Sequence, residues 1–410
     1  MVGHDVGERL RVRRRGLAGL AGLAGLGVAA APVLAACSTE TIAAGAAPLA
    51  FRGAHQGVLT VSAPAGLVGA FDVRVETRDE LARLLADLST TVEGLMGDVP
   101  VRERGGGFPA ADTGILGPDH GPTGTGVVLG LGASLFDDRF GLSDRRPPGL
   151  QPMPRFSNDR LVTPERSNGD LSLTISASSS EAVVHATRQI LRATRGRLVP
   201  RWVQSGTNQV SPGVRSTPLT GRNLLGFKDG TVNPDPAATA SMDEVVWVGA
   251  GDGHPEWAVG GTYQAVRVIR MLVEFWDRTR LSEQEAIFHR HRDTGAPLGA
   301  ADEFDAVDFP DAAALDSHIG RINPRTADSP EHVMLRRGFN YANGLDDNDQ
   351  LDEGLLFVSY QRDLEIGFLG TQRRLDGEAL EEYVAPQGGG LFFVPPGPGA
   401  HGSLARGLFD

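Results

Sequence analysis

The 410-residue chain contains one cysteine, Cys37, and one lysine, Lys228. A single cysteine cannot form an internal disulfide, so the stability of the folded chain must come from packing and from any bound cofactor. Aromatic residues are also scarce, at 6% of the sequence. The 54 glycines and 26 prolines indicate many turns, and the length allows two domains with sizeable cores.

The chain also lacks an excess of positive charge. Its net charge is −12 at pH 7. Residues 1–36 carry five arginines against Asp5 and Glu8, so the remainder stands at about −15. Nucleic-acid binding requires a basic surface, so we expect no nucleic-acid partner.

Only one long apolar run is present, from Leu17 to Ala36, and it follows Arg13-Arg14-Arg15. Basic residues before a weakly apolar segment rich in glycine and alanine are typical of a secretory signal. The paired arginines resemble a twin-arginine (Tat) signal, which exports proteins that have already folded. A membrane anchor is the alternative, and the high glycine content disfavours it. Residues 1–36 are therefore predicted to be an export signal.

Cys37 ends the sequence Val33-Leu34-Ala35-Ala36-Cys37, which resembles a bacterial lipobox. Cleavage before Cys37 would free its thiol for lipid attachment and tether the protein to the outer face of the membrane. Ordinary signal cleavage at Ala44-Gly45-Ala46 would instead release a soluble exported protein. The lipobox is the favoured alternative, and residues 37–50 are predicted to be a flexible linker.

Residues 51–215 are predicted to form a first domain in which strands and helices alternate. Helix Thr77–Met96 is indicated by Leu81, Leu84, Leu85 and Leu88 at helical spacing. A second helix is expected at Ser180–Thr194. The expected strands are Gly57–Val61, Ala70–Val75, Thr125–Leu131 and Leu171–Ala177. This order favours an α+β fold, with an antiparallel sheet and helices packed on its face.

Residues 216–410 repeat the same order of elements, with the join near Val210 to Asn223. The helix expected at Ser282–Arg292 has Ser282 as its N-cap and Glu285 as the partner in a capping box. The other expected elements are strands Gly261–Phe275, Gly354–Gln361 and Gly390–Val394 and a short helix at Ala379–Val384. The two halves are therefore predicted to be two ferredoxin-like domains.

Three sequence motifs carry polar groups suited to catalysis. Gly226-Phe227-Lys228-Asp229-Gly230-Thr231 places a carboxylate inside a tight turn. His318-Ile319 precedes Asn323-Pro324-Arg325, and Leu335-Arg336-Arg337-Gly338 follows, so that Arg336 lies eighteen residues after His318. In this order the motifs resemble the dye-decolourising (DyP-type) peroxidases, most closely the exported branch that includes deferrochelatase-type members. The resemblance runs from about Phe51 to the carboxyl end.

The resemblance implies a haem b cofactor, one per chain, in the C-terminal half. His318 would be the proximal ligand of the iron, since a neutral imidazole binds haem iron well. Asp229 matches the family's distal aspartate and Arg336 its distal arginine. The implied activity is reduction of hydrogen peroxide through a ferryl intermediate, with oxidation of dyes, phenols or other bulky organic reductants.

Further residues are placed around the haem by the same resemblance. Leu355 and Phe357, two apart on one strand, would share a face and roof the distal pocket. Arg321 and Arg325 would meet the haem propionates, although Gly320 stands where the family often has arginine. The carboxylate that orients His318 is expected in the pair Glu381-Glu382, with Glu382 preferred.

The motifs leave a second function open. A haem-handling protein of the deferrochelatase type, which releases iron and spares the porphyrin, would bind haem through the same residues. A third alternative, an exported haem-binding lipoprotein without redox activity, would leave Asp229 and Arg336 unexplained. The expected partners are hydrogen peroxide, organic reductants and haem, with self-association into a homo-oligomer left open. The membrane is expected as a partner only through a lipid at Cys37.

Overall fold

The computed structural model describes residues 56–59, 63–208, 220–398 and 402–410. The predicted export signal, Cys37 and the linker at 37–50 lie outside the described residues, as does most of the predicted join between the halves. None of the described helices is long and apolar enough to cross a membrane.

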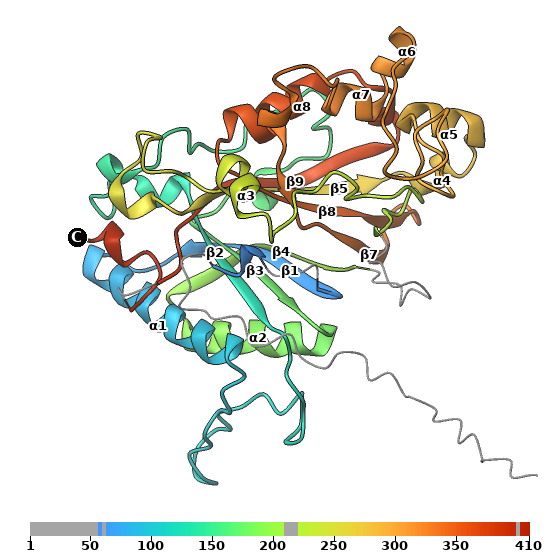
Figure 1. Cartoon of the computed structure of the whole chain (residues 1–410). Coiled ribbons are helices and arrows are strands. Elements are labelled where there is room, and N and C mark those ends of the chain that lie inside the picture. The colour runs from blue at the N-terminus through green and yellow to red at the C-terminus, as the bar shows by residue number, and fades with distance from the viewer. Residues whose placement is uncertain (1–55, 60–62, 209–219, 399–401) are drawn as a thin grey trace, which may run out of the picture. The chain divides into compact units, whose positions relative to one another are not determined.

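The first half has the order strand, helix, strand, strand, helix, strand. Its elements are β1 (Ala65–Val73), α1 (Arg78–Met96), β2 (Gly126–Gly132), β3 (Leu171–Ala177), α2 (Ser180–Ala193) and β4 (Leu198–Thr207). The strands lie in the order β2-β3-β1-β4 and all pair antiparallel. Helices α1 and α2 contact each other, and α2 packs on β1 and β3 (Figure 1).

The second half repeats this arrangement. Its strands are β5 (Thr262–Met271), β6 (Leu335–Arg336), β7 (Phe339–Leu345), β8 (Leu351–Gln361) and β9 (Val384–Val394). Its strand order β7-β8-β5-β9 corresponds to β2-β3-β1-β4 of the first half, and β6 is added on β8. Its helices are α3 (Thr239–Val245), α4 (Val273–Trp276), α5 (Leu281–Phe288), α6 (Ala312–Leu315), α7 (His318–Ile322) and α8 (Gly370–Arg374). The predicted α+β fold with two ferredoxin-like units is confirmed.

The two sheets join at both ends. Strand β2 pairs with β9 at Leu131↔Phe393, and β4 pairs with β7 at Thr207↔Asn340. Because β5 also pairs with β8, the strands form a closed ring, β5-β9-β2-β3-β1-β4-β7-β8. One face of the ring is lined by buried apolar side chains from both halves, among them Val68, Val128, Val266, Val268, Leu356, Val358 and Phe392. Alternate residues of β5 and β8 therefore point to the opposite face, where the cavity described below lies.

Several predicted elements differ from the structure. Gly57–Val61 was predicted as a strand, but Gly57–Leu59 is a 3-10 helix. The capping box at Ser282 is wrong, because α5 begins at Leu281 and its N-cap, Arg280, makes no side-chain cap. Glu285 instead accepts the backbone N–H of Arg292. The α1 helix has its capping box at Thr77 and Glu80.

A buried carboxylate, Asp170, holds the first half together. It accepts hydrogen bonds from the Arg139 guanidinium at 2.8 and 3.1 Å, the Ser134 hydroxyl at 2.6 Å and the Val73 backbone N–H at 2.9 Å. Burial alone would raise the pKa of Asp170. These donors outweigh burial and hold the pKa below its ordinary value.

We predict that Asp170→Asn lowers the free energy of unfolding by about 2 kcal/mol at pH 7, because buried donors lose a charged acceptor. A depressed carboxylate pKa stabilises the fold above the ordinary pKa of about 4, and this stabilisation is lost as the pH falls further. The difference between wild type and variant should therefore shrink in acid. Urea unfolding at several pH values measures it.

Asp137→Asn is the matched control, because Asp137 also binds Arg139 but its side chain is 46% exposed. Its effect should stay below about 1 kcal/mol. Equal effects of the two substitutions would contradict the role given to Asp170.

Candidate active site

A cavity of about 260 Å³ lies on the outer face of the second-half sheet. Its floor is formed by apolar side chains that alternate with the buried ones, Ile269 and Met271 of β5 and Leu355 and Phe357 of β8. Helices α7 and α8 supply the facing wall. Of the described residues that line it, only Asn158 comes from the first half. Leu355 and Phe357 thus share one face and border the cavity.

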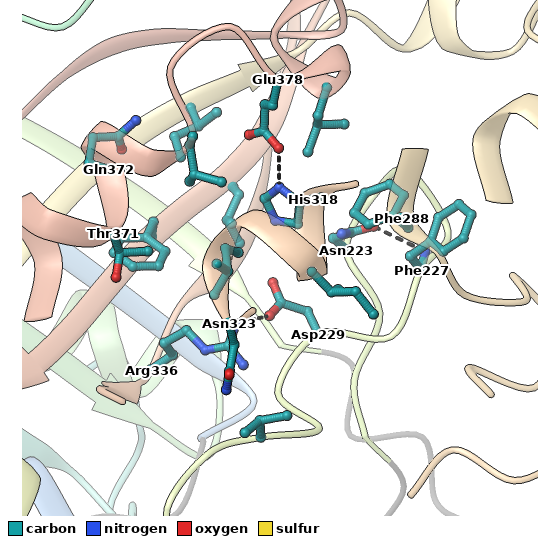
Figure 2. Close-up of a pocket in the computed structure, with 18 of the residues that line it drawn as sticks. Asn223, Phe227, Asp229, Phe288, His318, Asn323, Arg336, Thr371, Gln372 and Glu378 are labelled. Carbon is teal, nitrogen blue, oxygen red and sulfur yellow. Dashed lines mark hydrogen bonds and ion pairs between the residues drawn. The ribbon is translucent and has the colours of Figure 1, made fainter. Parts of the chain in front are cut away.

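His318 is the first residue of α7 and lines the cavity. Its Nδ1 lies 2.7 Å from Oε2 of Glu378, whose side chain is only 5% exposed. Figure 2 shows Glu378 on one side of the imidazole ring and Asp229 on the other. Burial alone would lower the pKa of His318, but the facing carboxylate outweighs it and holds the pKa above its ordinary value.

Gly320 follows His318 within α7, where the sequence departs from the family pattern. A Cβ at this position would lie 2.4 Å from the Leu315 carbonyl oxygen and 2.8 Å from that of Ala314. No side chain fits there unless the backbone moves. The close packing of α7 on α6 therefore requires glycine.

The preference for Glu382 as the partner of His318 is wrong. Glu382 is exposed and is not among the described residues that line the cavity. The 3-10 helix Ala379–Glu382 separates it from Glu378, which is the N-cap of that helix. The turn Asp376-Gly377 is the sequence signal that marks this boundary, since glycine commonly precedes a new element.

Asp229 and Arg336 meet on the other side of the cavity from Glu378. Arg336 Nη1 lies 3.3 Å from Asp229 Oδ1, and both side chains are about 30% exposed. The flanking glycines have φ of +89° at Gly226 and +120° at Gly230, so the turn that presents Asp229 needs residues without a Cβ. The neighbouring Arg337 is not among the described residues that line the cavity, in keeping with the alternation of side chains between the two faces of a strand.

Asn233 is a positioning residue that the motifs did not reveal. Its Oδ1 accepts the Arg336 backbone N–H at 3.0 Å and Nε at 3.4 Å, and its Nδ2 donates to the Arg336 carbonyl at 3.0 Å. Because Asn233 belongs to the same loop as Asp229, one amide fixes the arginine relative to the aspartate. An Asn-Pro pair is usually assigned to a turn, which concealed this role.

The expected contact of Arg321 with a propionate is wrong. Its guanidinium binds Asp316 and the carbonyls of Arg374, Asp376 and Gly377, and it is not among the residues that line the cavity.

Arg325 does line the cavity, and its side chain forms no hydrogen bond or ion pair with any described residue. Arg290, which sequence reasoning missed, also lines it, and the two guanidinium groups are close enough to repel each other. Burial lowers the pKa of both arginines. This edge of the cavity therefore offers two cations to a carboxylate ligand.

The residues present fit haem b. Among the described residues, no cluster of three or more His, Cys, Asp or Glu side chains could hold a bare metal ion. A lone histidine oriented by a buried carboxylate suits an iron whose other in-plane ligands come from a porphyrin. Apolar side chains from the sheet suit the macrocycle, and the cations Arg290 and Arg325 suit its carboxylates.

Comparison with sequence families agrees with this site. Residues 55–208 match the family model described as Dyp-type peroxidase, N-terminal, and residues 220–398 match Dyp-type peroxidase, C-terminal. A deferrochelatase from Escherichia coli O157:H7 is 45% identical over 401 residues, covering 94% of this chain and 93% of the relative. A deferrochelatase from Shigella sonnei is 47% identical over 357 residues, covering 85% and 84%.

Solved structures agree as well. A DyP-type peroxidase from Streptomyces coelicolor superposes with a TM-score of 0.79 at 35% identity, covering 88% of this chain and 96% of that one. The oxyferrous complex of DtpA from Streptomyces lividans gives 0.78 at 36% identity with the same coverage.

We predict that Glu378→Gln weakens haem binding about 10- to 100-fold, because the amide removes the charged acceptor of His318. Titration of the purified protein with haem, followed in the Soret band, measures the affinity. Glu382→Gln is the matched control and should bind haem like the wild type. Weakening in Glu382→Gln, with Glu378→Gln unchanged, would reverse the assignment.

Proposed function

The chain belongs to the Dyp-type peroxidase family and is a haem-dependent peroxidase that uses haem b, and from this we propose that Asp229 and Arg336 together activate hydrogen peroxide. The observation that carries the proposal is their ion pair, which borders the same cavity as His318. When bound, haem supplies the iron whose electrons reduce the peroxide and are replaced by an organic reductant.

Asp229 moves the proton. Breaking the O–O bond of hydrogen peroxide to release water requires a proton to leave one oxygen and reach the other. The Asp229 carboxylate faces the cavity from a turn that holds its backbone, with its N–H bonded to the Gly221 carbonyl at 2.9 Å. A carboxylate at that place can accept the first proton and return it to the departing oxygen.

Arg336 supplies a fixed positive charge. Negative charge develops on the departing oxygen as the bond breaks, and a positioned guanidinium stabilises it without having to reorganise. Asn233 supports this role because it holds both the backbone and the Nε of Arg336. The guanidinium therefore keeps its place when the ligand enters.

The remaining lining residues are proposed to hold the cofactor. His318 would bind the iron through Nε2, since Nδ1 is engaged by Glu378. Leu355 and Phe357, which border the cavity, would pack against the macrocycle, and Arg325, joined by Arg290, would bind its propionate carboxylates. We propose dyes, phenols and other bulky reductants as the electron donors, on the basis of family membership.

Iron release from haem is the second candidate function. It is favoured by the relatives named deferrochelatase at 45 to 47% identity. The two functions are separated by one readout: release of iron leaves a metal-free porphyrin, which fluoresces. Anaerobic incubation of the haem-loaded protein with a reductant and without peroxide would show porphyrin fluorescence only if iron is released.

We further propose that the protein is exported by the Tat route and tethered by a lipid at Cys37. The support is the sequence alone, with Arg13-Arg14-Arg15 before the apolar run and Ala36-Cys37 at its end. Export after folding suits a protein that acquires haem in a buried site.

We predict that Arg336→Leu slows the reaction with hydrogen peroxide about 10²- to 10³-fold and Asp229→Asn about 10²- to 10⁴-fold, with haem still bound. Stopped-flow mixing with peroxide measures the rate, and the Soret band reports haem content. Asp235→Asn, an exposed carboxylate in the same loop, is the control and should react normally. Unchanged peroxide rates in both active-site variants would exclude their proposed roles.

Replacing Arg13, Arg14 and Arg15 together by lysine should keep the protein inside the cell, because the Tat receptor reads arginine and not charge alone. Cell fractionation measures this. Cys37→Ser should leave export intact and abolish labelling by a radioactive fatty acid. Export of the lysine variant at the normal level would contradict the Tat assignment.

A further inference from the structure

Two arginines outside the cavity link helix α7, which carries His318, to the segment that carries Glu378. Arg321 Nη1 donates to the carbonyls of Arg374 at 3.1 Å and Asp376 at 2.7 Å, and Nη2 donates to that of Gly377 at 3.4 Å. In the other direction, Arg374 Nε donates to the Arg321 carbonyl at 3.0 Å and Nη2 to the Ile322 carbonyl at 2.9 Å. The two side chains thus bind each other's backbone.

These bonds satisfy groups that short helices leave unpaired. The last carbonyls of a helix have no partner within it. Helix α7 has only five residues, and α8 is the last part of a helical segment that begins as the π-helix Glu365–Leu369. A helix as short as α7 is not stable alone. Arg374 caps the last two carbonyls of α7, and Arg321 caps the last carbonyl of α8 and two carbonyls of the turn that follows. The cations also oppose the negative ends of both helix dipoles.

The linked segments are those that carry His318 and its acceptor. Arg321 lies one turn after His318, and its acceptors at residues 376 and 377 directly precede Glu378. On its other side α7 packs closely on α6, since a Cβ at Gly320 would lie 2.4 Å from the Leu315 carbonyl oxygen. The segments that carry His318 and Glu378, whose Nδ1 and Oε2 lie 2.7 Å apart, are thus held by contacts on both sides of α7.

We propose that Arg321 and Arg374 are positioning residues that set the His318–Glu378 hydrogen bond, and through it the strength with which His318 donates electrons to the haem iron. The proposal rests on the proposed role of His318 as iron ligand. Neither arginine is among the residues that line the cavity, so both act only through the segments that they join. A shorter bond to Glu378 gives the imidazole more anionic character, which favours the oxidised iron.

The test uses the haem-loaded protein with Arg321→Lys and Arg374→Lys. Lysine keeps the charge and the stem but cannot span several carbonyls in fixed directions. In both variants we expect the iron–histidine stretching band of the reduced protein to move to lower frequency and the reduction potential of the iron to rise. Haem affinity should fall about tenfold. Glu378→Gln should change the same three quantities in the same directions.

Combining Arg321→Lys with Glu378→Gln shows whether the arginine positions Glu378 or only stabilises the fold. If the arginines act through Glu378, Arg321→Lys will cause no further shift of the stretching band or potential when Glu378→Gln is already present. Asp316→Ala is the matched control, because it removes the exposed carboxylate partner of Arg321 and leaves the carbonyl acceptors in place. It should leave both quantities unchanged.

Two results would overturn the proposal. One is a lowered melting temperature in both lysine variants with the stretching band and potential of the wild type. The other is shifts that add fully to those of Glu378→Gln. If His318 is the ligand, the wild-type protein must show an iron–histidine band, and His318→Ala must abolish it. If either result failed, the proposed ligand would be wrong, and not the role of the arginines. The two failures are therefore distinguishable.

Discussion

The hydrogen bond between His318 and Glu378 is the contact around which the second half is arranged. A carboxylate that is 5% exposed must have a strong partner, and an imidazole that serves as a ligand must present one fixed nitrogen. Each requirement is met by the other residue. Helix α7, the end of α8 and the turn before Glu378 surround this pair and are joined by hydrogen bonds from Arg321 and Arg374. The cavity face of the imidazole is thereby free to bind.

The two sides of the cavity use different physical means. On the side of His318, two short segments are linked by arginine–carbonyl bonds, and the charge of Glu378 is buried. On the other side, Asp229 and Arg336 remain about 30% exposed, and Asn233 holds the arginine through an uncharged amide. A buried acceptor favours electron donation to a ligand, whereas an accessible carboxylate can exchange protons. The difference in burial matches the difference between the proposed roles.

Much of the fold could be predicted from the sequence, because local patterns determined it. Strand β3 was predicted with its bounds, since Leu171–Ala177 is a compact apolar run, and α1 was predicted because its leucines recur at helical spacing. The helix at Ser282 was placed correctly, but its cap was not. Ser282 has the right residue type, and only the backbone shows that α5 has already begun at Leu281.

The site was predictable where a motif carries the chemistry within a few residues. Asp229, His318 and Arg336 all line one cavity, although Asp229 is far from the other two residues in the sequence. Glu378 and Asn233 were missed because their roles depend on contacts between distant segments. Arg321 was assigned to a haem propionate because it is a cation close in sequence to His318, the expected iron ligand. Its direction in space depends on α8, which no pattern near Arg321 describes.

The closed ring of strands has a consequence for the order in which the chain can fold. Strand β2 receives its neighbour β9, and β4 receives β7, only from the second half. When only the first half has emerged from the ribosome, its sheet has two unpaired edges, at β2 and β4, which can pair with other chains. These edges close only after β9, near the end of the chain, has been synthesised. Until then, the first-half sheet exposes both edges to pairing with other chains.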